Sequence, residues 1–384
     1  MRRPLLLLVG AVILVDTMFY AALAPLLPAL RHDLGLTKSD AGVLVGAYAL
    51  GTFFGAIPGG WAAARFGARA AVLTGLALMS TAGLAFAFAQ SLPALDVARF
   101  IQGLGGACSW TAGLAWIAQE TDRERRGEAL GIAIGAGIFG AQFGPALGSL
   151  ATQVGREAAF AGAAVLGLVL AACVLNTAHG EGALVESGSP PSAILRDRRF
   201  RLALWFTALP SICFGVVEVL VPLRLDVLGA TALAIGLIFF IAAFFEALVS
   251  PVVGRIADRR GAQAVVRVGT VAAAAGLALL VLPTSVVALA VVLTGASVAL
   301  GSLWVPGGTL VSSRAESLDV DQGWAFAFNN VGWAAGVAIG SAGGGALAQA
   351  AGDWLPYGLG ALLCLATGVA AMAHRPGRPL RSST

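Results

Sequence analysis

The chain has 384 residues, of which 58% are apolar and only 11% are charged, and its mean hydropathy is +0.87. Soluble proteins contain roughly 25% charged residues, so this chain lacks the polar surface that two or three soluble domains need. The same shortage excludes nucleic-acid binders, disordered scaffolds and disulfide-rich secreted proteins. We interpret the net charge of +4 as a sign of membrane orientation rather than of an acidic partner.

Apolar runs recur along the whole chain, separated by polar or Gly- and Pro-rich breaks. A helix of about 20 apolar residues crosses a bilayer, and 384 residues shared among 12 helices leave 32 for each helix and its loop. We therefore predict an all-α membrane protein with 12 transmembrane helices. The runs lie at 5–30, 41–63, 70–90, 94–117, 129–153, 158–178, 202–228, 231–254, 264–283, 285–311, 323–350 and 354–373.

The first run, residues 5–30, is predicted to be a retained helix and not a cleaved signal peptide. It is longer than the about 7–15 apolar residues of a signal core, and it carries Asp16. The four cysteines all lie inside apolar runs at irregular spacing, which favours a packing role over disulfide bonds or metal binding.

The longest polar break, residues 179–200, divides the chain into six helices plus six. If both termini lie in the cytoplasm, 19 of the 24 Lys and Arg residues fall on that side, four fall on the other and Arg99 lies within a helix. The positive-inside rule selects this orientation. We predict a multi-pass protein of the cell (inner) membrane, organised as an N-terminal bundle at 1–178, a cytoplasmic central loop at 179–200, a C-terminal bundle at 201–373 and a cytoplasmic tail at 374–384.

Two motifs recur in the second half of the chain at nearly the same offset. A loop motif that begins at Gly60 returns at Gly254, 194 residues later. A glycine pattern that includes Gly140 returns at Gly336, 196 residues later. Parallel repeats of six helices build one large transporter fold, so we predict two pseudo-symmetric halves that rock around a central site.

The loop motif is a candidate conformational latch, with a solvated basic loop as the alternative. Glycine permits a tight turn, and an acid in such a loop can pair with arginines or cap a helix. The pattern Gly-x-x-x-Asp-Arg-x-Gly resembles the major facilitator superfamily, which implies the major facilitator fold. The first copy departs from that pattern at Ala64, where the family has Asp. The latch candidates are Gly60, Arg65 and Gly67 in the first copy and Gly254, Asp258, Arg259 and Gly261 in the second.

Arg99 lies inside the predicted helix 94–117. A charged arginine at mid-bilayer costs at least about 2.5–3.5 kcal/mol, so it needs a partner or water. Asp96, one turn earlier, is one possible partner, and a position facing the central cavity is the alternative. The stretch Arg99-x-x-Gln102-Gly103 resembles the segment that the superfamily carries in its fourth helix, and this resemblance implies a role for Arg99 in proton coupling.

Helix 129–153 carries the most specific local pattern in the chain. Small residues at such spacing let another helix approach closely, and a proline bends the helix, so packing alone explains a large part of the pattern. The full spacing resembles the antiporter signature of the drug:proton exporters of this superfamily, which implies export; Ser149 replaces the final glycine of that signature. The residues of the motif are Gly131, Gly140, Gly144, Pro145 and Gly148.

Three carboxylates lie deep in predicted helices: Asp16, Glu218 and Glu246. Carboxyl groups at membrane depth are functional candidates by default, and removal from water favours their protonated form. Each is a candidate for proton coupling or substrate binding, with a helix–helix hydrogen bond as the alternative. The first and seventh helices resemble the vesicular amine transporter branch, but Trp304 and Asn330 stand where that branch carries further acids.

The remaining candidates are residues that could line a cavity: Tyr20, Gln102, Trp110, Trp304, Phe328 and Asn330. The sequence has no phosphate-binding Gly-x-x-x-x-Gly-Lys-Ser/Thr loop and no metal-ligand spacing, so we predict no cofactor, no metal and no enzymatic activity. We predict a monomeric secondary transporter that exports small amphipathic or cationic compounds against protons. The alternative is a proton-coupled uptake symporter or a facilitator of a small polar metabolite; a non-transporting receptor is disfavoured.

Overall fold

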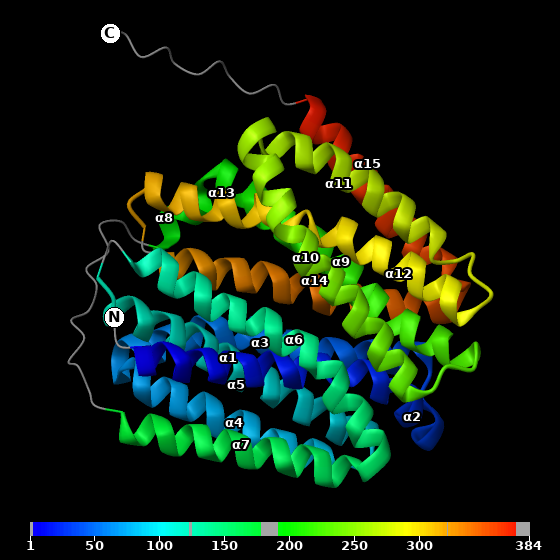
Figure 1. The fold of residues 1–384 in the computed structure, drawn as a ribbon, viewed down its shortest axis with the longest axis horizontal. Coiled ribbons are helices and arrows are strands. Elements are labelled where there is room, and N and C mark those ends of the chain that lie inside the picture. Colours follow the sequence, from blue (N-terminus) through cyan, green and yellow to red (C-terminus); the bar gives the residue numbers. More distant parts are fainter. Residues whose placement is uncertain (1–2, 123–124, 178–190, 321, 374–384) are drawn as a thin grey trace.

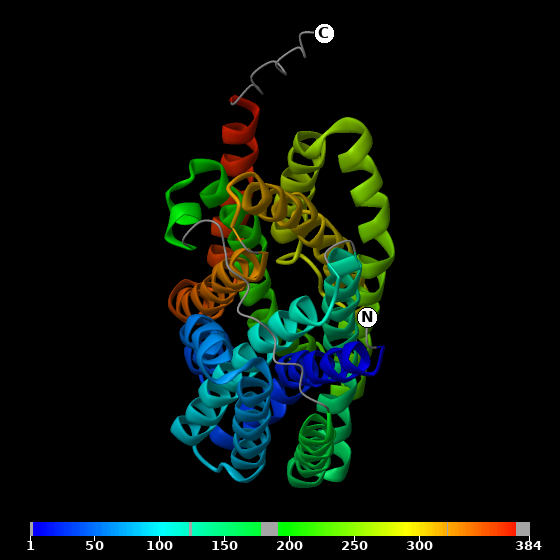
Figure 2. The same ribbon diagram turned by 90° about the vertical axis from the view of Figure 1, so that its left-hand side faces the viewer.

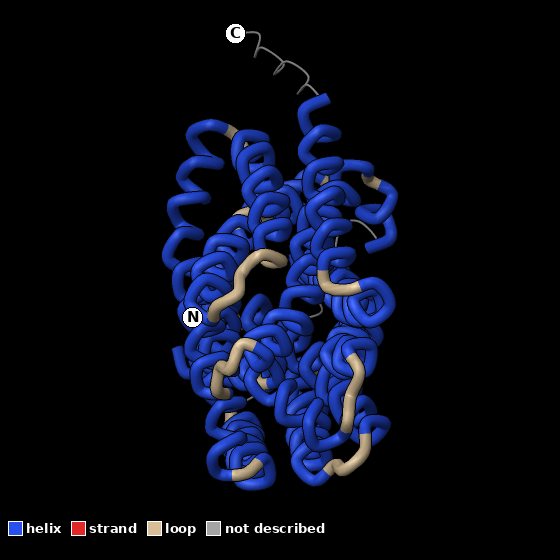
Figure 3. Tube along the Cα trace, turned by 90° about the vertical axis from the view of Figure 1, so that its right-hand side faces the viewer, coloured by secondary structure: helices blue, strands red, loops and turns tan. Residues whose placement is uncertain are grey.

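The structure is a computed structural model that describes residues 3–122, 125–177, 191–320 and 322–373. All regular secondary structure in these ranges is helical (Figure 3). The helices are α1 (Arg3–Ala21), α2 (Leu23–Leu34), α3 (Lys38–Phe66), α4 (Ala68–Phe88), α5 (Leu92–Gln119), α6 (Arg126–Val154), α7 (Arg156–Asn176), α8 (Pro191–Arg196), α9 (Arg198–Val227), α10 (Ala232–Arg260), α11 (Ala262–Leu279), α12 (Val286–Gly301), α13 (Trp304–Ser317), α14 (Gln322–Ala351) and α15 (Trp354–Ala373).

Eleven segments in the described part of the chain are long and apolar enough to cross a membrane. Two of them are helix pairs, α1 with α2 and α12 with α13. Helix α5 is the twelfth span: it has 28 residues, which suffice to cross, but its polar side chains lower its hydropathy. The predicted all-α, twelve-helix membrane class is confirmed. Large apolar side chains such as Leu7, Val268 and Val287 are more than 70% exposed, as expected for a surface that faces lipid.

Two predicted helices are broken, and the breaks share a physical cause. Proline cannot donate the hydrogen bond to the carbonyl four residues earlier. Pro25 leaves the carbonyl of Ala21 without that donor, and α1 ends at Ala21. Pro306 does the same for Ser302, directly after the end of α12. The breaks therefore place free backbone groups at membrane depth, once in each half.

The helices form two halves, α1–α7 and α9–α15, which lie one above the other in Figure 1 and are seen from one side in Figure 2. We call the end of the bundle where α1 begins and α15 ends the basal end, and the opposite end the apical end. Corresponding helices pack alike in both halves: α6 lies on α1, and α14 lies on α9. Between the halves, α3 packs on α14 and α6 on α10.

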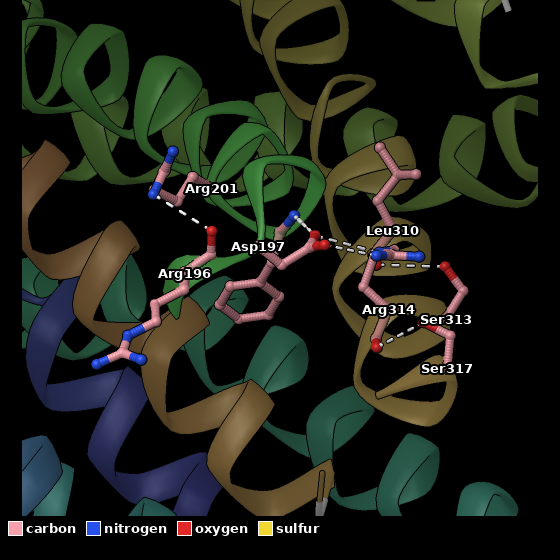
Figure 4. A network of polar contacts seen from close by, with 8 residues as sticks. Arg196, Asp197, Arg201, Leu310, Ser313, Arg314 and Ser317 are labelled. Atoms are coloured by element: carbon pink, nitrogen blue, oxygen red, sulfur yellow. Dashed lines mark hydrogen bonds and ion pairs between the residues drawn. The ribbon is translucent and has the colours of Figure 1, made fainter. Parts of the chain in front are cut away.

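The predicted central loop, 179–200, contains the short helix α8 and the start of α9. Asp197, between these helices, accepts a hydrogen bond from the backbone nitrogen of Phe200 and so caps α9. Arg314 of α13 reaches the same carboxylate with two nitrogens, at 3.2 Å and 2.5 Å (Figure 4). Residues 178–190 and the predicted tail 374–384 lie outside the described residues.

Candidate functional site

A cavity of about 600 Å³ lies between the two halves. Its walls come from α1, α2, α3, α5 and α6 of the first half and from α9, α10, α12, α13 and α14 of the second. Helices α4, α7, α11 and α15 contribute no lining residue and pack outside these. Apolar side chains dominate the wall, and a few polar groups converge in it, which is the usual build of a small-molecule site.

Contacts between the halves close the cavity at the apical end. Lys38 Nζ, at the start of α3, lies 2.5 Å from Asp353 Oδ1, beyond the end of α14. His32 Nε2 lies 2.9 Å from Asp226 Oδ2. Glycine lets α3 and α14 approach, since a Cβ on Gly42 would lie only 3.1 Å from the Cα of Gly345. The lining residues instead extend toward the basal ends of the helices, as far as Phe326 and Val253, so the cavity faces the basal end.

Arg99 is buried in the cavity wall, with 2% of its surface exposed. Its Nη1 and Nη2 donate to the carbonyls of Phe19 and Tyr20 at 3.0 Å and 3.1 Å, in the last turn of α1. Such carbonyls lack intrahelical partners, so the break after α1 supplies acceptors for a buried cation. The guanidinium also lies 4.8 Å from the centre of the Tyr48 ring, a cation–π contact.

The structure corrects one alternative and one prediction for this region. The ion pair between Arg99 and Asp96 does not form in the described structure, where Arg99 binds α1 carbonyls and Asp96 Oδ1 is buried without a hydrogen-bond partner. Gln102, a predicted cavity residue, does not line the cavity. It is fully buried, and its Oε1 accepts from Arg99 Nη1 at 2.9 Å, because both side chains leave the same face of α5 one turn apart.

Asp16 lies in the last two turns of α1 and lines the cavity. The hydroxyl of Tyr48, on α3, donates a hydrogen bond to Asp16 Oδ1. Gly106 on α5 makes room for this pair: a Cβ there would overlap Asp16 Oδ1 and would lie 2.7 Å from Tyr48 Oη. The carboxylate of Asp16 is thus fixed by the hydrogen bond from Tyr48 and packs directly on the backbone of Gly106.

Glu218 lies within α9 of the second half and also lines the cavity. Tyr20, on α1, donates its hydroxyl proton to Glu218 Oε2 at 2.5 Å, so this bond joins the two halves at mid-depth. The Tyr20 ring lies 5.2 Å from the Tyr48 ring and 5.2 Å from the Trp333 ring of α14. The two tyrosines, packed against each other and against Arg99, therefore link both carboxylates into one cluster.

The other predicted residues divide between cavity and core. Trp110, Glu246, Trp304 and Asn330 line the cavity. Phe328 does not; it is buried with Phe200 and Trp324 at the basal end of α9 and α14.

Sequence reasoning missed several cavity residues, above all Tyr48, Phe214 and Trp333. For Tyr48 a signal existed, because the chain has only 3 tyrosines and this one stands in an otherwise apolar run.

The glycine motif of α6 packs against α1 and α2. A Cβ on Gly140, Gly144 or Gly148 would overlap atoms of Leu14, Ala21 or Ala22, respectively. Pro145 lines the cavity. Gly131 does not belong to this stripe, since nothing lies within 4 Å of a Cβ placed there. It precedes Gly140 by nine residues, which at about 100° per residue places it on the opposite face of the helix.

The two loop motifs have matching turn geometry. Gly67, between α3 and α4, has φ +90°, and Gly261, between α10 and α11, has φ +84°, both in the region that only glycine adopts freely. Arg65 and Arg259 are exposed at these turns, and a Cβ on Gly60 or Gly254 would meet nothing within 4 Å. The side chain of Asp258 lies outside the described residues, so the latch remains a prediction.

In the described part of the chain, no three His, Cys, Asp or Glu side chains come together as a possible metal site.

Comparisons with known proteins agree with this architecture. The family profile of the Major Facilitator Superfamily matches residues 9–319 and 211–384. The chloramphenicol resistance protein of Streptomyces lividans is 32% identical over 350 residues, which are 88% of either chain. The synaptic vesicular amine transporter of Bos taurus is 29% identical over 301 residues, which are 76% of this chain and 58% of that protein. This chain thus spans little more than half the length of that relative.

A solved structure of similar fold is the xylose transporter XylE of E. coli, in a partially occluded inward open conformation. It superimposes with a TM-score of 0.77, covers 99% of both chains and is 14% identical in sequence. At that identity the similarity concerns the fold.

Proposed function

This chain belongs to the major facilitator superfamily, whose members carry small molecules across membranes and are not enzymes, and we propose that it exports small amphipathic or cationic compounds in exchange for protons. The single observation that carries the proposal is the hydrogen bond from Tyr20 to Glu218. It connects a carboxylate of the second half to a hydroxyl of the first half at the level of the cavity. The protonation state of Glu218 therefore affects the strength of the contact between the two halves.

Protonation of Glu218 weakens this connection. A hydrogen bond to a carboxylate is roughly twice as strong as one to a neutral acceptor, so a proton on Glu218 favours separation of the halves. Asp16 sits in the same cluster through Tyr48, and Arg99 contacts both tyrosines. With both acids ionised, the cluster carries one negative charge in excess, which either a proton or a cationic substrate neutralises.

Exchange then follows from competition for this negative charge. A substrate enters from the basal end, which faces the cytoplasm in the orientation that the positive-inside rule selects for a cell membrane. Reorientation exposes the cavity apically, where protonation displaces the substrate. One pH unit supplies about 1.4 kcal/mol per proton. A potential of 100 mV adds about 2.3 kcal/mol per net charge moved, so it helps to drive the exchange of one proton for one neutral molecule, whereas the exchange of one proton for one monovalent cation moves no net charge and is driven by the pH gradient.

Two similarities support this direction of transport. One relative is named for chloramphenicol resistance, and the α6 motif resembles that of drug:proton exporters. The wall also contains few amides, whereas a carrier of polar nutrients needs many hydrogen-bonding groups.

The test uses the purified protein in liposomes with an imposed pH gradient. A panel of lipophilic cations and neutral drugs, including chloramphenicol, is added, and proton flux is recorded with a pH-sensitive dye. We expect substrate-triggered proton movement opposite to the substrate, lost in Asp16→Asn and Glu218→Gln and retained in Asp33→Asn. Asp33 is the matched control because it is exposed at the end of α2.

Co-directional movement of proton and substrate would establish symport and would refute the proposed exchange. Coupled export that survives both Asp16→Asn and Glu218→Gln would remove the tyrosine-linked carboxylates from the mechanism.

A further inference from the structure

Glu246 is the one cavity carboxylate among the described residues that the tyrosine–arginine cluster does not include. It lies on α10, in the wall formed by the second half, and has no hydrogen-bond or ion-pair partner in the described part of the chain. An ionised carboxylate in an apolar wall is unfavourable unless a counter-charge or water accompanies it. The structure thus holds an acidic group that faces the cavity and lacks a protein partner.

The backbone opposite Glu246 is shaped to admit this side chain. Gly301 is the last residue of α12, and a Cβ there would lie 2.5 Å from both Cδ and Oε1 of Glu246. Any residue other than glycine would therefore displace the carboxyl group. The helix break directly after Gly301 turns the chain into α13, whose first residue, Trp304, also lines the cavity.

Trp304 contributes a second polar group without a partner. Its Nε1 is buried, and no hydrogen-bond acceptor lies within reach in the described residues. Its ring is stacked on Phe214 of α9, with ring centres 5.1 Å apart and an angle of 24° between the planes. A buried donor without an acceptor costs about 1–3 kcal/mol, a penalty that a ligand acceptor would relieve.

We propose that Glu246, Trp304 and Phe214 form a substrate subsite for lipophilic organic cations that also carry a hydrogen-bond acceptor. The carboxylate of Glu246 pairs with the cationic group, the Phe214–Trp304 stack contacts the aromatic or aliphatic body, and Trp304 Nε1 donates to an ether, ester or carbonyl oxygen. This inference rests on the proposed export function and names the substrate class. It assigns substrate recognition to this subsite and proton coupling to the cluster of Asp16, Glu218 and Arg99.

Glu246 and Trp304 select for different chemical features of the ligand. Ion pairing in an apolar wall discriminates by charge, because a neutral ligand leaves Glu246 unpaired. A neutral ligand such as chloramphenicol does not use the carboxylate, so its binding should not depend on it. The donor of Trp304 discriminates between two cations of similar lipophilicity when only one of them has an acceptor.

The experiment measures equilibrium binding to the purified protein with three probes. Rhodamine 6G is a lipophilic cation with ether and ester oxygens, tetraphenylphosphonium is a lipophilic cation without an acceptor, and chloramphenicol is neutral. We expect Glu246→Gln to weaken binding of both cations at least about tenfold and to leave chloramphenicol unchanged. We expect Trp304→Phe, which keeps the aromatic stack, to weaken rhodamine 6G about three- to tenfold and to leave tetraphenylphosphonium unchanged.

Glu157→Gln, at an exposed position at the start of α7, is the matched control and should bind all three probes as the original chain does. Cation binding that is insensitive to Glu246→Gln, or equal losses for all three probes, would overturn the assignment. Failure of the original chain to bind either cation would overturn it as well. Proton flux with chloramphenicol would still test the proposed export function on its own, so the two failures are distinguishable.

A measurement on the unsubstituted protein covers the case in which the variants do not fold. Dicyclohexylcarbodiimide, an apolar reagent, modifies carboxyl groups in membranes, and mass spectrometry of the peptides reports each site separately. We expect a saturating concentration of rhodamine 6G to slow modification of Glu246 at least about fivefold, because the bound cation covers the carboxyl group and keeps it in the ionised form, which the reagent does not attack. Modification of Glu246 at an unchanged rate would refute the subsite.

Discussion

The hydroxyl of Tyr20 lies 2.5 Å from Glu218 Oε2, although the two residues are 198 positions apart and belong to different halves of the molecule. Tyr20 leaves α1 one residue before that helix ends, and Glu218 sits inside α9. Since α1 and α9 are the first long helices of their halves, the bond joins equivalent elements of the two repeats. Any movement that separates the halves at this level must break it.

Removing the Tyr20 hydroxyl should shift the conformational equilibrium. A hydrogen bond to a charged group contributes about 1.5–3 kcal/mol, so Tyr20→Phe should raise the ratio of the population with separated apical ends to the closed population about ten- to a hundredfold. Distances between spin labels on Asp33→Cys and Val227→Cys, at the apical ends of α2 and α9, would report this opening. Cys173, which is exposed, is replaced by Ser in this background.

Tyr357→Phe is the matched control for this experiment, because Tyr357 is buried in α15 and does not line the cavity. It should leave the distance distribution unchanged. Equal distributions for Tyr20→Phe and the original chain would show that the bond does not hold the halves together.

Loss of the apical ion pair between Lys38 and Asp353 should also favour opening of the apical end, with a smaller effect than loss of the Tyr20 hydroxyl. Both side chains are partly exposed, at 27% and 28%, and such pairs contribute about 0.2–1 kcal/mol. Lys38→Ala should therefore increase the apically open population about two- to fivefold, measured with the same spin labels. The exchange Lys38→Asp with Asp353→Lys should restore the original distribution; if it does not, the effect of Lys38→Ala arises from something other than charge pairing.

The fold was predictable from the sequence because features that can be read along the chain determine it. Twelve runs of suitable length, separated by polar breaks, specify the helices, and the recurrence of two motifs specifies the two halves. The breaks in α1–α2 and α12–α13 were missed although Pro25 and Pro306 signal them. In apolar runs that long, the mean hydropathy stays high across the break, so a prediction from composition alone does not detect the break.

The site was predictable only in part. Asp16, Arg99 and Glu218 stand out because charge is rare in apolar helices, and the structure brings them together. Their partners depend on which helix faces lie opposite one another. Tyr48 reaches Asp16 across 32 residues, and Arg99 binds carbonyls of a helix about 80 residues away. Backbone carbonyls carry no sequence signature, so the preference of Arg99 for α1 over Asp96 required the structure.

The glycines of the α6 motif should differ sharply in their tolerance of side chains. Gly140→Ala places a Cβ against the carbonyl of Leu14 and the hydroxyl of Thr17, so α6 and α1 must move apart. Overpacking of this kind typically costs about 1–3 kcal/mol. Gly131→Ala, in the same helix and the same motif, meets nothing within 4 Å and should be neutral or stabilising by up to about 1 kcal/mol. Thermal unfolding in detergent compares the two, and equal losses would contradict the packing assigned to the stripe.

The pair of Asp197 and Arg314 should make stability depend on pH. The hydrogen bond from Arg314 holds the pKa of Asp197 below its ordinary value. A carboxyl group with a lowered native pKa stabilises the folded state above its unfolded pKa, and this contribution is lost as the pH falls through the native value. The stability difference between the original chain and Asp197→Asn should thus be full at pH 7, about 1 kcal/mol, and should vanish in strong acid.

Two substitutions separate the ion pair from the helix cap. Asn is as good an N-cap as Asp, so Asp197→Asn removes the charge and keeps the cap of α9, whereas Asp197→Ala removes both. Asp197→Ala should therefore lose a further amount of about 1 kcal/mol that does not change with pH. Denaturation with dodecyl sulfate, followed by tryptophan fluorescence at a series of pH values, measures both differences. A pH-independent difference for Asp197→Asn would show that the carboxylate is held by the cap alone and that Arg314 contributes no charge pairing.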